Sequence, residues 1–381
     1  MPRFRKMFAP PLSMAPGPLA LGPDRLRDLT DFGANPGALR ARSYLPEALP
    51  AQAALVAVLH GCTQTAAGYD HGAGWSALAD EAGFALLFPE QQPANNPNRC
   101  FNWFSAEDVG RGRGEAESIR QMVDRMLATH GLDRNRVFVT GLSAGGAMTM
   151  AMLASYPDVF AGGAVIAGLP FGTATSVPQA FQRMRGEDAR EGDALAALVR
   201  AGSGHAGPWP TLSVWQGDAD RTVSPRNAAL IVSQWRALHG LPAEPTRTER
   251  RNGHARRVWS DADGRDLIEE VTIAGMGHGT PLDTAGEAAG GNAGPFMLEA
   301  GISSTRDIAR FWGLLPPRAA ASAARGSAAE PARALVPAAP PAASAPRLHR
   351  APEPAAADTP AGAGFVQATI ENALRAAGLM R

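Results

Sequence analysis

One pentapeptide in the chain has the spacing of a catalytic serine. The sequence GLSAG at residues 141–145 follows the pattern G-x-S-x-G, between a β-branched run at 137–140 and small, helix-favouring residues at 144–156. At a strand-to-helix junction this pattern is typical of a nucleophile elbow, whose turn strains the serine and exposes its hydroxyl. The positive end of the helix dipole then favours a developing anion. We predict that Ser143 is a nucleophile; the alternative is an ordinary glycine-rich turn.

A serine hydroxyl is a weak nucleophile, so the site also needs a base and a carboxylate that orients the base. In proteins with an elbow these residues follow in the order Ser, Asp or Glu, His. Asp218 and Asp220 both follow a strand-like run at 212–215. We favour Asp220 as the acid, because Asp218 is placed to cap the turn through its own backbone. His278, flanked by glycines after a strand-like run at 270–273, is the predicted base.

The other histidines fit the role of base less well. His254 lies in the charged stretch RRNGHARR, where we expect a solvated surface turn. The remaining candidates lack a position just after a strand and downstream of Asp220; they are His71, His130, His205, His239 and His349. His60, in the sequence HGCT, is expected to brace its loop by hydrogen bonds rather than to transfer protons.

An acyl-transfer site also needs two backbone N–H groups that stabilise the oxyanion. One donor should be Ala144, directly after the nucleophile. The other should come from the HGCT loop after the strand-like run at 53–59, and we choose Cys62. Three aromatic residues either line an apolar acyl pocket or belong to the core: Trp103, Phe104 and Trp215.

The elements that must position these residues alternate along the chain. Strand-like runs alternate with helical patterns, which predicts an α/β fold: a mostly parallel sheet with helices on both faces and ligand sites at the strand ends. Besides the runs already named, strands are expected at 84–88 and 163–167, and helices at 75–82, around 119–127, at 228–238 and at 305–312.

The composition divides the chain into four parts. Residues 1–50 are rich in proline and glycine and are expected to be irregular, with a short strand near 42–44. Residues 51–315 carry the catalytic pattern, and 171–210, which lack a strand pattern, are expected to form an insertion over the strand ends. Residues 316–364 are rich in alanine and proline, which is typical of a disordered linker. Residues 365–381 predict a short amphipathic helix, which docks on a partner or on the protein's own domain.

Charge and cysteine content exclude several classes of function. Lys and Arg together number 36 among 381 residues, as do Asp and Glu, so no net charge draws the protein to nucleic acid. No apolar run approaches the roughly 20 residues that span a bilayer, and prolines make the N-terminus a poor signal peptide. Cys62 and Cys100 either pair or remain thiols. No metal-ligand spacing accompanies them, and we expect neither a metal nor an organic cofactor.

Five blocks of sequence between Val58 and about Trp312 resemble the α/β-hydrolase esterases of the polyhydroxybutyrate depolymerase family. In chain order they are LHGCTQTAAGY, NRCFNWF, VTGLSAGGAMTMAMLASYPDVFAGGAVIAG, PWPTLSVWQGDADRTVSPRNA and GMGHGTP. The resemblance implies an α/β-hydrolase fold and a triad of Ser143, Asp220 and His278. It also implies that Cys62 belongs to the oxyanion loop and bonds to Cys100, and that the protein is extracellular. The poor signal peptide argues for the cytoplasm instead.

The resemblance implies a serine esterase that forms an acyl-enzyme, acting on hydroxybutyrate oligomers or polymer. Related branches cleave feruloyl or acetyl esters of plant polysaccharides, so the fold does not decide the substrate. No separate substrate-binding domain with strands of its own follows the linker, which favours soluble oligomers or small esters over crystalline polymer. An alternative of another class is a non-catalytic protein on storage granules, attached by the tail helix.

Overall fold

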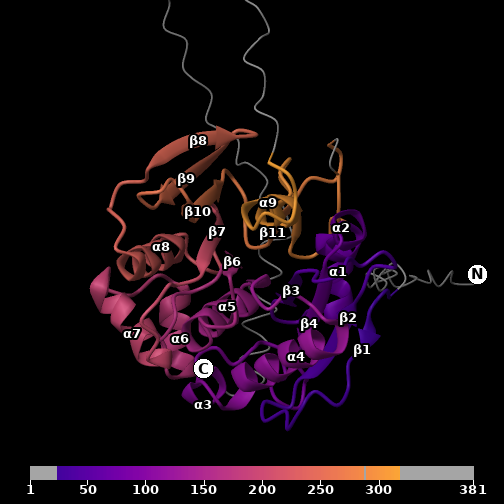
Figure 1. Cartoon of the computed structure of the whole chain (residues 1–381). Helices are drawn as coiled ribbons and strands as arrows, with labels where there is room; N and C mark the ends of the chain where they lie inside the picture. The colour runs from indigo at the N-terminus through magenta and orange to yellow at the C-terminus, as the bar shows by residue number, and fades with distance from the viewer. Residues whose placement is uncertain (1–23, 287–288, 318–381) are drawn as a thin grey trace, which may run out of the picture. The chain divides into compact units, whose positions relative to one another are not determined.

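The computed structural model describes residues 24–286 and 289–317 of the chain. In these residues a ten-stranded sheet has the strand order β1-β2-β4-β3-β5-β6-β7-β10-β9-β8, and β11 and β12 form a separate two-stranded sheet (Figure 1). The strands are β1 (Arg27–Asp28), β2 (Arg40–Tyr44), β3 (Leu55–Leu59), β4 (Ala85–Glu90), β5 (Val137–Leu142), β6 (Gly162–Ile166), β7 (Thr211–Gly217), β8 (Arg247–Arg251), β9 (His254–Ser260), β10 (Asp266–Ile273), β11 (Thr280–Leu282) and β12 (Met297–Glu299). The helices are α1 (Ala66–Ala73), α2 (Trp75–Ala82), α3 (Ala106–Val109), α4 (Gly114–His130), α5 (Ala144–Ser155), α6 (Val177–Met184), α7 (Asp193–Ser203), α8 (Arg226–His239) and α9 (Ser304–Phe311).

The middle of the large sheet is parallel. From β4 through β3, β5, β6 and β7 to β10, each strand runs in the same direction as its hydrogen-bonded neighbour. The outer strands, β1 and β2 at one side and β9 and β8 at the other, pair in antiparallel fashion. The carboxyl ends of the parallel strands therefore meet at one edge, which is where ligand sites lie in sheets of this kind.

The sequence of β3 shows how the sheet separates two cores. Successive side chains of a strand point to opposite faces. Leu55, Ala57 and Leu59 accordingly join one hydrophobic core, and Val56 and Val58 join the other. All five residues are buried, and such a continuous apolar run is typical of a parallel strand that is covered on both faces.

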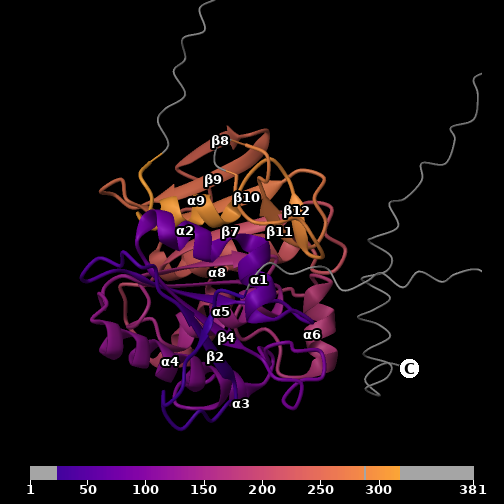
Figure 2. The ribbon, with the colours of Figure 1, turned by 90° about the vertical axis from the view of Figure 1, so that its right-hand side faces the viewer.

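Two layers of helices supply the other half of each core. α4, α5, α7 and α8 bury apolar side chains in the same core as Leu55, whereas α1, α2 and α9 do so in the core of Val56. The ribbons of α1, α2 and α9 lie side by side (Figure 1 and Figure 2). In α4 the buried residues recur at helical spacing, which gives the helix one apolar stripe against the sheet. The helix ends where Gly131 adopts a left-handed conformation with φ 60°.

The predicted fold, a mostly parallel sheet with helices on both faces, is confirmed. The strands and helices expected from the sequence between residues 42 and 312 are all present, with shifts at their ends. Elements that the sequence patterns did not predict include α1 and the hairpin of β8 and β9, whose arginine-rich sequence resembles a solvated loop. In the hairpin, Arg256 is buried because its guanidinium Nε donates to the carboxylate of Glu269 at 2.7 Å.

Two observations bear on the predicted division of the chain. The short strand expected near 42–44 is present as β2, which pairs with β4, so the sheet begins before residue 51. Residues 171–210 lack strands, as expected, and the end of α6 is bonded to the loop after β7, where Ser224 N donates to Met184 O at 2.7 Å. α7 instead packs against α5 and α8 and places Ala196 and Val199 in the core. The predicted tail helix at 365–381 and the linker beyond residue 317 lie outside the described residues, as do residues 1–23.

Candidate active site

Ser143 stands at a strained turn between β5 and α5. Its backbone has φ 58° and ψ −116°, a conformation that costs a residue with a side chain on the order of 1–3 kcal/mol. Hydrogen bonds hold the turn on both sides: Ser143 N donates to Ile166 O and Ala147 N donates to Ser143 O, each at 2.9 Å. The strain is thus maintained by β6 on one side and by the first turn of α5 on the other.

The two glycines of the pentapeptide are required by close backbone contacts. A Cβ at Gly141 would lie 2.4 Å from the carbonyl carbon and oxygen of Gly145. A Cβ at Gly145 would lie 2.3 Å from Leu59 O and 2.5 Å from His60 O. Because Gly145 has no side chain, the first turn of α5 packs directly against the chain that leaves β3.

The predicted acid and base follow neighbouring strands, β7 and β10, and their loops interlock. Asp218 N donates to Ile273 O and Ala219 N donates to Met276 O, both at 3.1 Å. A Cβ at Gly217 would lie 2.2 Å from Met276 O, so this position too admits only glycine. The two loops are therefore held in a fixed relation to each other.

Asp220 and His278 form a buried pair across these loops. His278 Nδ1 lies 2.7 Å from Asp220 Oδ2, and the side chains are 7% and 0% exposed. Gln216 Nε2 also donates to Oδ2, at 3.0 Å, and the N–H groups of Thr222 and Val223 donate to Oδ1 at 2.8 and 2.9 Å. Since an ionised carboxylate only accepts hydrogen bonds, Nδ1 carries the proton of the neutral ring. This leaves Nε2 of His278 as the basic nitrogen.

Asp218 has a different role from Asp220. Its side chain is exposed, and its Oδ1 accepts a hydrogen bond from Gly275 N at 2.6 Å. The sequence suggested that Asp218 caps its own turn, but the structure shows it capping the neighbouring loop that carries His278. Asp218 thereby helps to fix the base without contacting it.

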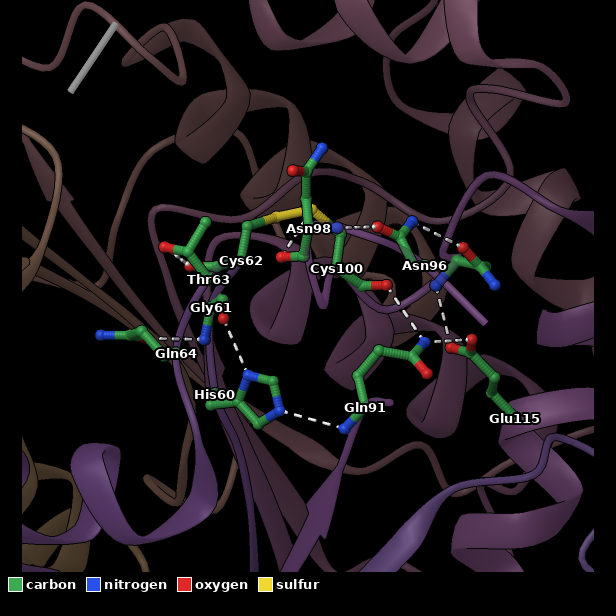
Figure 3. Close-up of a disulfide and its surroundings, with 11 residues drawn as sticks. His60, Gly61, Cys62, Thr63, Gln64, Gln91, Asn96, Asn98, Cys100 and Glu115 are labelled. Atoms are coloured by element: carbon green, nitrogen blue, oxygen red, sulfur yellow. Dashed lines mark hydrogen bonds between the residues drawn. A yellow bond between two sulfur atoms is a disulfide. The ribbon is translucent and has the colours of Figure 1, made fainter. Parts of the chain in front are cut away.

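The predicted oxyanion loop follows β3 and is fastened to a second segment. A disulfide joins Cys62 to Cys100 with a Cα–Cα distance of 4.3 Å (Figure 3). Beside it, Thr63 N donates to Asn98 O at 2.6 Å, and within the loop Gly61 N donates to the Gln64 side chain at 2.8 Å. The structure thus contains the disulfide that the family resemblance implied.

Ala144 is the first residue of α5, and the first N–H groups of a helix have no acceptor within it. The contact of Gly145 with Leu59 O and His60 O places this helix start against the loop of Cys62. The two predicted donors, Ala144 and Cys62, therefore come from segments that pack on each other.

His60 braces this loop, as the sequence suggested. Its ring is 1% exposed, and burial lowers its pKa, which favours the neutral form. Nδ1 faces Gly61 O at 2.8 Å, and Nε2 accepts from Gln91 N at 3.1 Å (Figure 3). A carbonyl accepts only, so the proton is on Nδ1 and both nitrogens are occupied. His60 is therefore a structural histidine.

The three predicted pocket aromatics divide into two groups. Trp103 and Phe104 are half-buried, and Trp103 packs with Met184 against a small apolar cluster of Ala147, Leu169 and Val223. Trp215, in contrast, is wholly buried in the core and donates its indole N–H to Ser213 Oγ at 2.8 Å. Its assignment to a substrate pocket is therefore corrected.

Sequence reasoning missed Met184. Its carbonyl accepts from Ser224 N at 2.7 Å, which fixes the end of α6 to the loop that carries Asp220. Phe296 was also missed; its ring centroid is 6.1 Å from that of His278, at an interplanar angle of 84°. Neither residue belongs to a motif, and both reach the site only through the tertiary fold.

The expectation of a solvated His254 is wrong. The residue is buried at the start of β9, where its Nδ1 accepts from Ala274 N at 3.2 Å and its Nε2 lies 2.9 Å from Ala300 O. The ring thus supports the first residue after β10. Among the described residues no group of three His, Cys, Asp or Glu side chains is arranged to hold a metal, and no helix is long and apolar enough to cross a membrane.

A strained serine after a central strand, a buried Asp–His pair after two later strands and a parallel sheet covered on both faces define an α/β-hydrolase. The sequence model of the Esterase PHB depolymerase family matches residues 40–259. The chain belongs to this family, and the resemblance found from the sequence is confirmed.

Characterised relatives cover much of the chain. Poly(3-hydroxyalkanoate) depolymerase C of Paucimonas lemoignei is 44% identical over 311 residues, which are 81% of this chain and 74% of the relative. Feruloyl esterase B of Talaromyces funiculosus is 30% identical over 68% of this chain and 74% of its own length. The solved structure of an acetyl xylan esterase from Aspergillus awamori matches 76% of this chain and 99% of its own with a TM-score of 0.65, at 25% identity.

Proposed function

We propose that the protein is a serine esterase that hydrolyses short hydroxyalkanoate esters through an acyl-enzyme. The observation that carries the proposal is the buried hydrogen bond between Asp220 and His278, which orients the imidazole after β10, at the same edge of the sheet as the strained Ser143 after β5. Its family membership and the depolymerase to which it is 44% identical support the ester substrate.

In the first half of the reaction, the Oγ of Ser143 bonds to the ester carbonyl carbon and its proton passes to Nε2 of His278. The ester C–O bond then breaks, and His278 gives this proton to the departing alcohol. In the second half, a water gives a proton to His278 and its oxygen bonds to the acyl carbon. The bond between the acyl carbon and Ser143 Oγ then breaks, the acid leaves, and His278 returns the proton to Oγ. Asp220 stabilises the imidazolium in both halves and stays ionised.

The negative charge on the carbonyl oxygen is stabilised by the N–H groups of Ala144 and Cys62 in this proposal. Fixed donors of this kind act on the charge that develops in the transition state, and the loss of one costs roughly 2.7–4 kcal/mol. The packing of Gly145 against the chain after β3 supports this pairing of donors, since it brings the first turn of α5 against the segment that leads to Cys62.

The half-buried Trp103 and Met184 are assigned to contact the acyl group, and they pack against the buried cluster of Ala147, Leu169 and Val223. Ala147 is one helical turn after Ser143, and Val223 follows the acid by three residues. Apolar side chains of this kind suit a short aliphatic acyl group. The similarity to feruloyl and acetyl xylan esterases supports a second candidate, an esterase for acyl groups on plant polysaccharides.

A panel of three esters tests the proposal: p-nitrophenyl butyrate, a soluble hydroxybutyrate oligomer and methyl ferulate. We expect wild-type protein to cleave the first two faster than the third, and Ser143→Ala to lose at least about a thousandfold in kcat. Preference for methyl ferulate would favour the second candidate.

Circular dichroism of Ser143→Ala provides the control that the fold survives the change. Wild-type protein inert on all three esters, or a fully active Ser143→Ala, would contradict the esterase mechanism. A non-catalytic protein that binds storage granules would then explain the fold better.

A further inference from the structure

Glu115, the second residue of α4, is a buried acid that the proposed mechanism does not use. Its side chain is only 1% exposed. The chain before β2 presses on it: a Cβ at Gly37 would lie 2.5 Å from the Cα of Glu115. Burial, with a smaller contribution from the negative charge of Asp108 on α3, raises the pKa of Glu115 to about 8. Burial of an ionisable group destabilises the folded state unless hydrogen bonds compensate for it.

Both carboxyl oxygens of Glu115 accept hydrogen bonds from one small region. Oε1 accepts from Gln91 Nε2, and Oε2 accepts from Asn102 N at 2.8 Å. Gln91 Nε2 donates in addition to Cys100 O, at 3.1 Å. Figure 3 shows the hydrogen bonds that lead from Glu115 through Gln91 to Cys100, whose sulfur is bonded to Cys62. One carboxyl group therefore fixes both ends of the segment 100–102, directly at Asn102 and through Gln91 at Cys100.

The same segment holds the predicted oxyanion loop. Cys100 is bonded covalently to Cys62, and two residues earlier Asn98 O accepts from Thr63 N at 2.6 Å. The other side of the loop is fixed by the hydrogen bond from Gln91 N to His60 Nε2. The connections that hold the loop from both sides thus converge on Gln91 and on the segment that Glu115 fixes.

We propose that Glu115 is a positioning residue for the oxyanion hole, which keeps the N–H of Cys62 in place through Gln91, Cys100 and the disulfide. This inference rests on the proposed esterase function. Oxyanion donors act when they lie about 2.7–3.1 Å from the charged oxygen, so a displacement of a few tenths of an ångström weakens them. Such a displacement affects the transition state more than the bound substrate.

The variant Glu115→Gln tests the inference because it keeps the size of the side chain and replaces one acceptor by a donor. Because the amide has only one oxygen, it can accept at only one of the two positions. The hydrogen bond from either Gln91 or Asn102 is therefore lost. We expect kcat for p-nitrophenyl butyrate to fall about ten- to a hundredfold while KM changes less than about threefold, the pattern of a lost transition-state interaction.

Glu117→Gln is the matched control. Glu117 lies two residues further along α4 and accepts from the Tyr156 hydroxyl and from Gln121, away from the disulfide. We expect its kcat to remain within about twofold of wild type. Equal kcat values in Glu115→Gln and Glu117→Gln, whether both unchanged or both lowered, would overturn the positioning role.

A second variant keeps the test decisive if Glu115→Gln does not fold. Gln91→Met removes the amide between Glu115 and Cys100 and is expected to lower kcat by a similar factor with KM retained; unchanged kcat would overturn the inference. Ser143→Ala, assayed alongside, separates the two proposals. If Ser143→Ala is inactive and Glu115→Gln is fully active, the esterase stands and only the role of Glu115 fails.

Discussion

Asp218 and Asp220 are two residues apart, yet only one of them faces His278. Asp220 is fully buried and accepts four hydrogen bonds, one of them from the imidazole, whereas Asp218 is exposed and accepts from Gly275 N. We expect Asp220→Asn to lower kcat by about 10⁴-fold, because an amide at this position favours the wrong histidine tautomer. Asp218→Asn keeps an oxygen that can accept from Gly275 N, so its kcat should fall less than about tenfold.

Steady-state kinetics on p-nitrophenyl butyrate distinguish the two variants, and each serves as the control for the other. Equal losses in both, or a larger loss in Asp218→Asn, would contradict the assignment of the acid.

At this scale the sequence predicts residues that belong to local patterns. Ser143 has its glycines within two positions, and Asp220 and His278 each follow a recognisable strand, so each leaves a local signal. Met184 and Phe296 reach the site through contacts with distant parts of the chain, and no local spacing records those contacts. Trp215 was ambiguous because an aromatic residue at the end of a strand-like run gives no local sign of whether it faces the core or a substrate pocket.

At the scale of elements, the disulfide connects two loops that are 38 residues apart. Closing a loop of this length stabilises the folded state by about 4 kcal/mol in the chain-entropy model, and often by less in practice. We therefore expect Cys100→Ser to lower the free energy of unfolding by about 2–4 kcal/mol. We also expect a lower kcat, because Thr63 N–H to Asn98 O would remain as the main link beside Cys62.

Urea unfolding and kinetics with and without dithiothreitol measure both effects. Reduction should weaken wild-type protein and leave Cys100→Ser unaffected. Wild-type kcat that is indifferent to dithiothreitol, in protein whose thiols are shown to be free, would refute the link to activity.

The elements that the sequence predicted are those with continuous apolar runs or clear helical spacing. β3, β5 and β7 are buried on both faces, so every residue contributes to the signal. The hairpin of β8 and β9 gave no such signal, because its buried positions include Arg256 and His254, whose polar groups are satisfied by Glu269 and by main-chain atoms. Polar residues that are buried with partners look the same in a sequence as solvated ones.

For the whole molecule, Glu115 makes stability depend on pH. Its pKa is raised from 4.5 to about 8, first by burial, so the folded state keeps a proton that the unfolded chain has released. The contribution to stability is complete below pH 4.5 and is lost as pH rises to about 8. In that window the free energy of unfolding of wild-type protein should fall by up to about 1.4 kcal/mol per pH unit relative to that of Glu115→Gln, which has no proton to release.

Urea unfolding of both proteins at pH 5.5, 7 and 8.5 measures this difference, which should shift in favour of Glu115→Gln as pH rises. A difference that does not change with pH would mean that Glu115 does not hold its proton in the folded protein.

The bond between Cys62 and Cys100 also has a consequence for when the protein becomes active. The elbow and the Asp–His pair form by folding alone, whereas the predicted oxyanion loop acquires its covalent link only after two thiols are oxidised. On the proposed function, the chain would therefore reach its full kcat only after an oxidant had formed this bond.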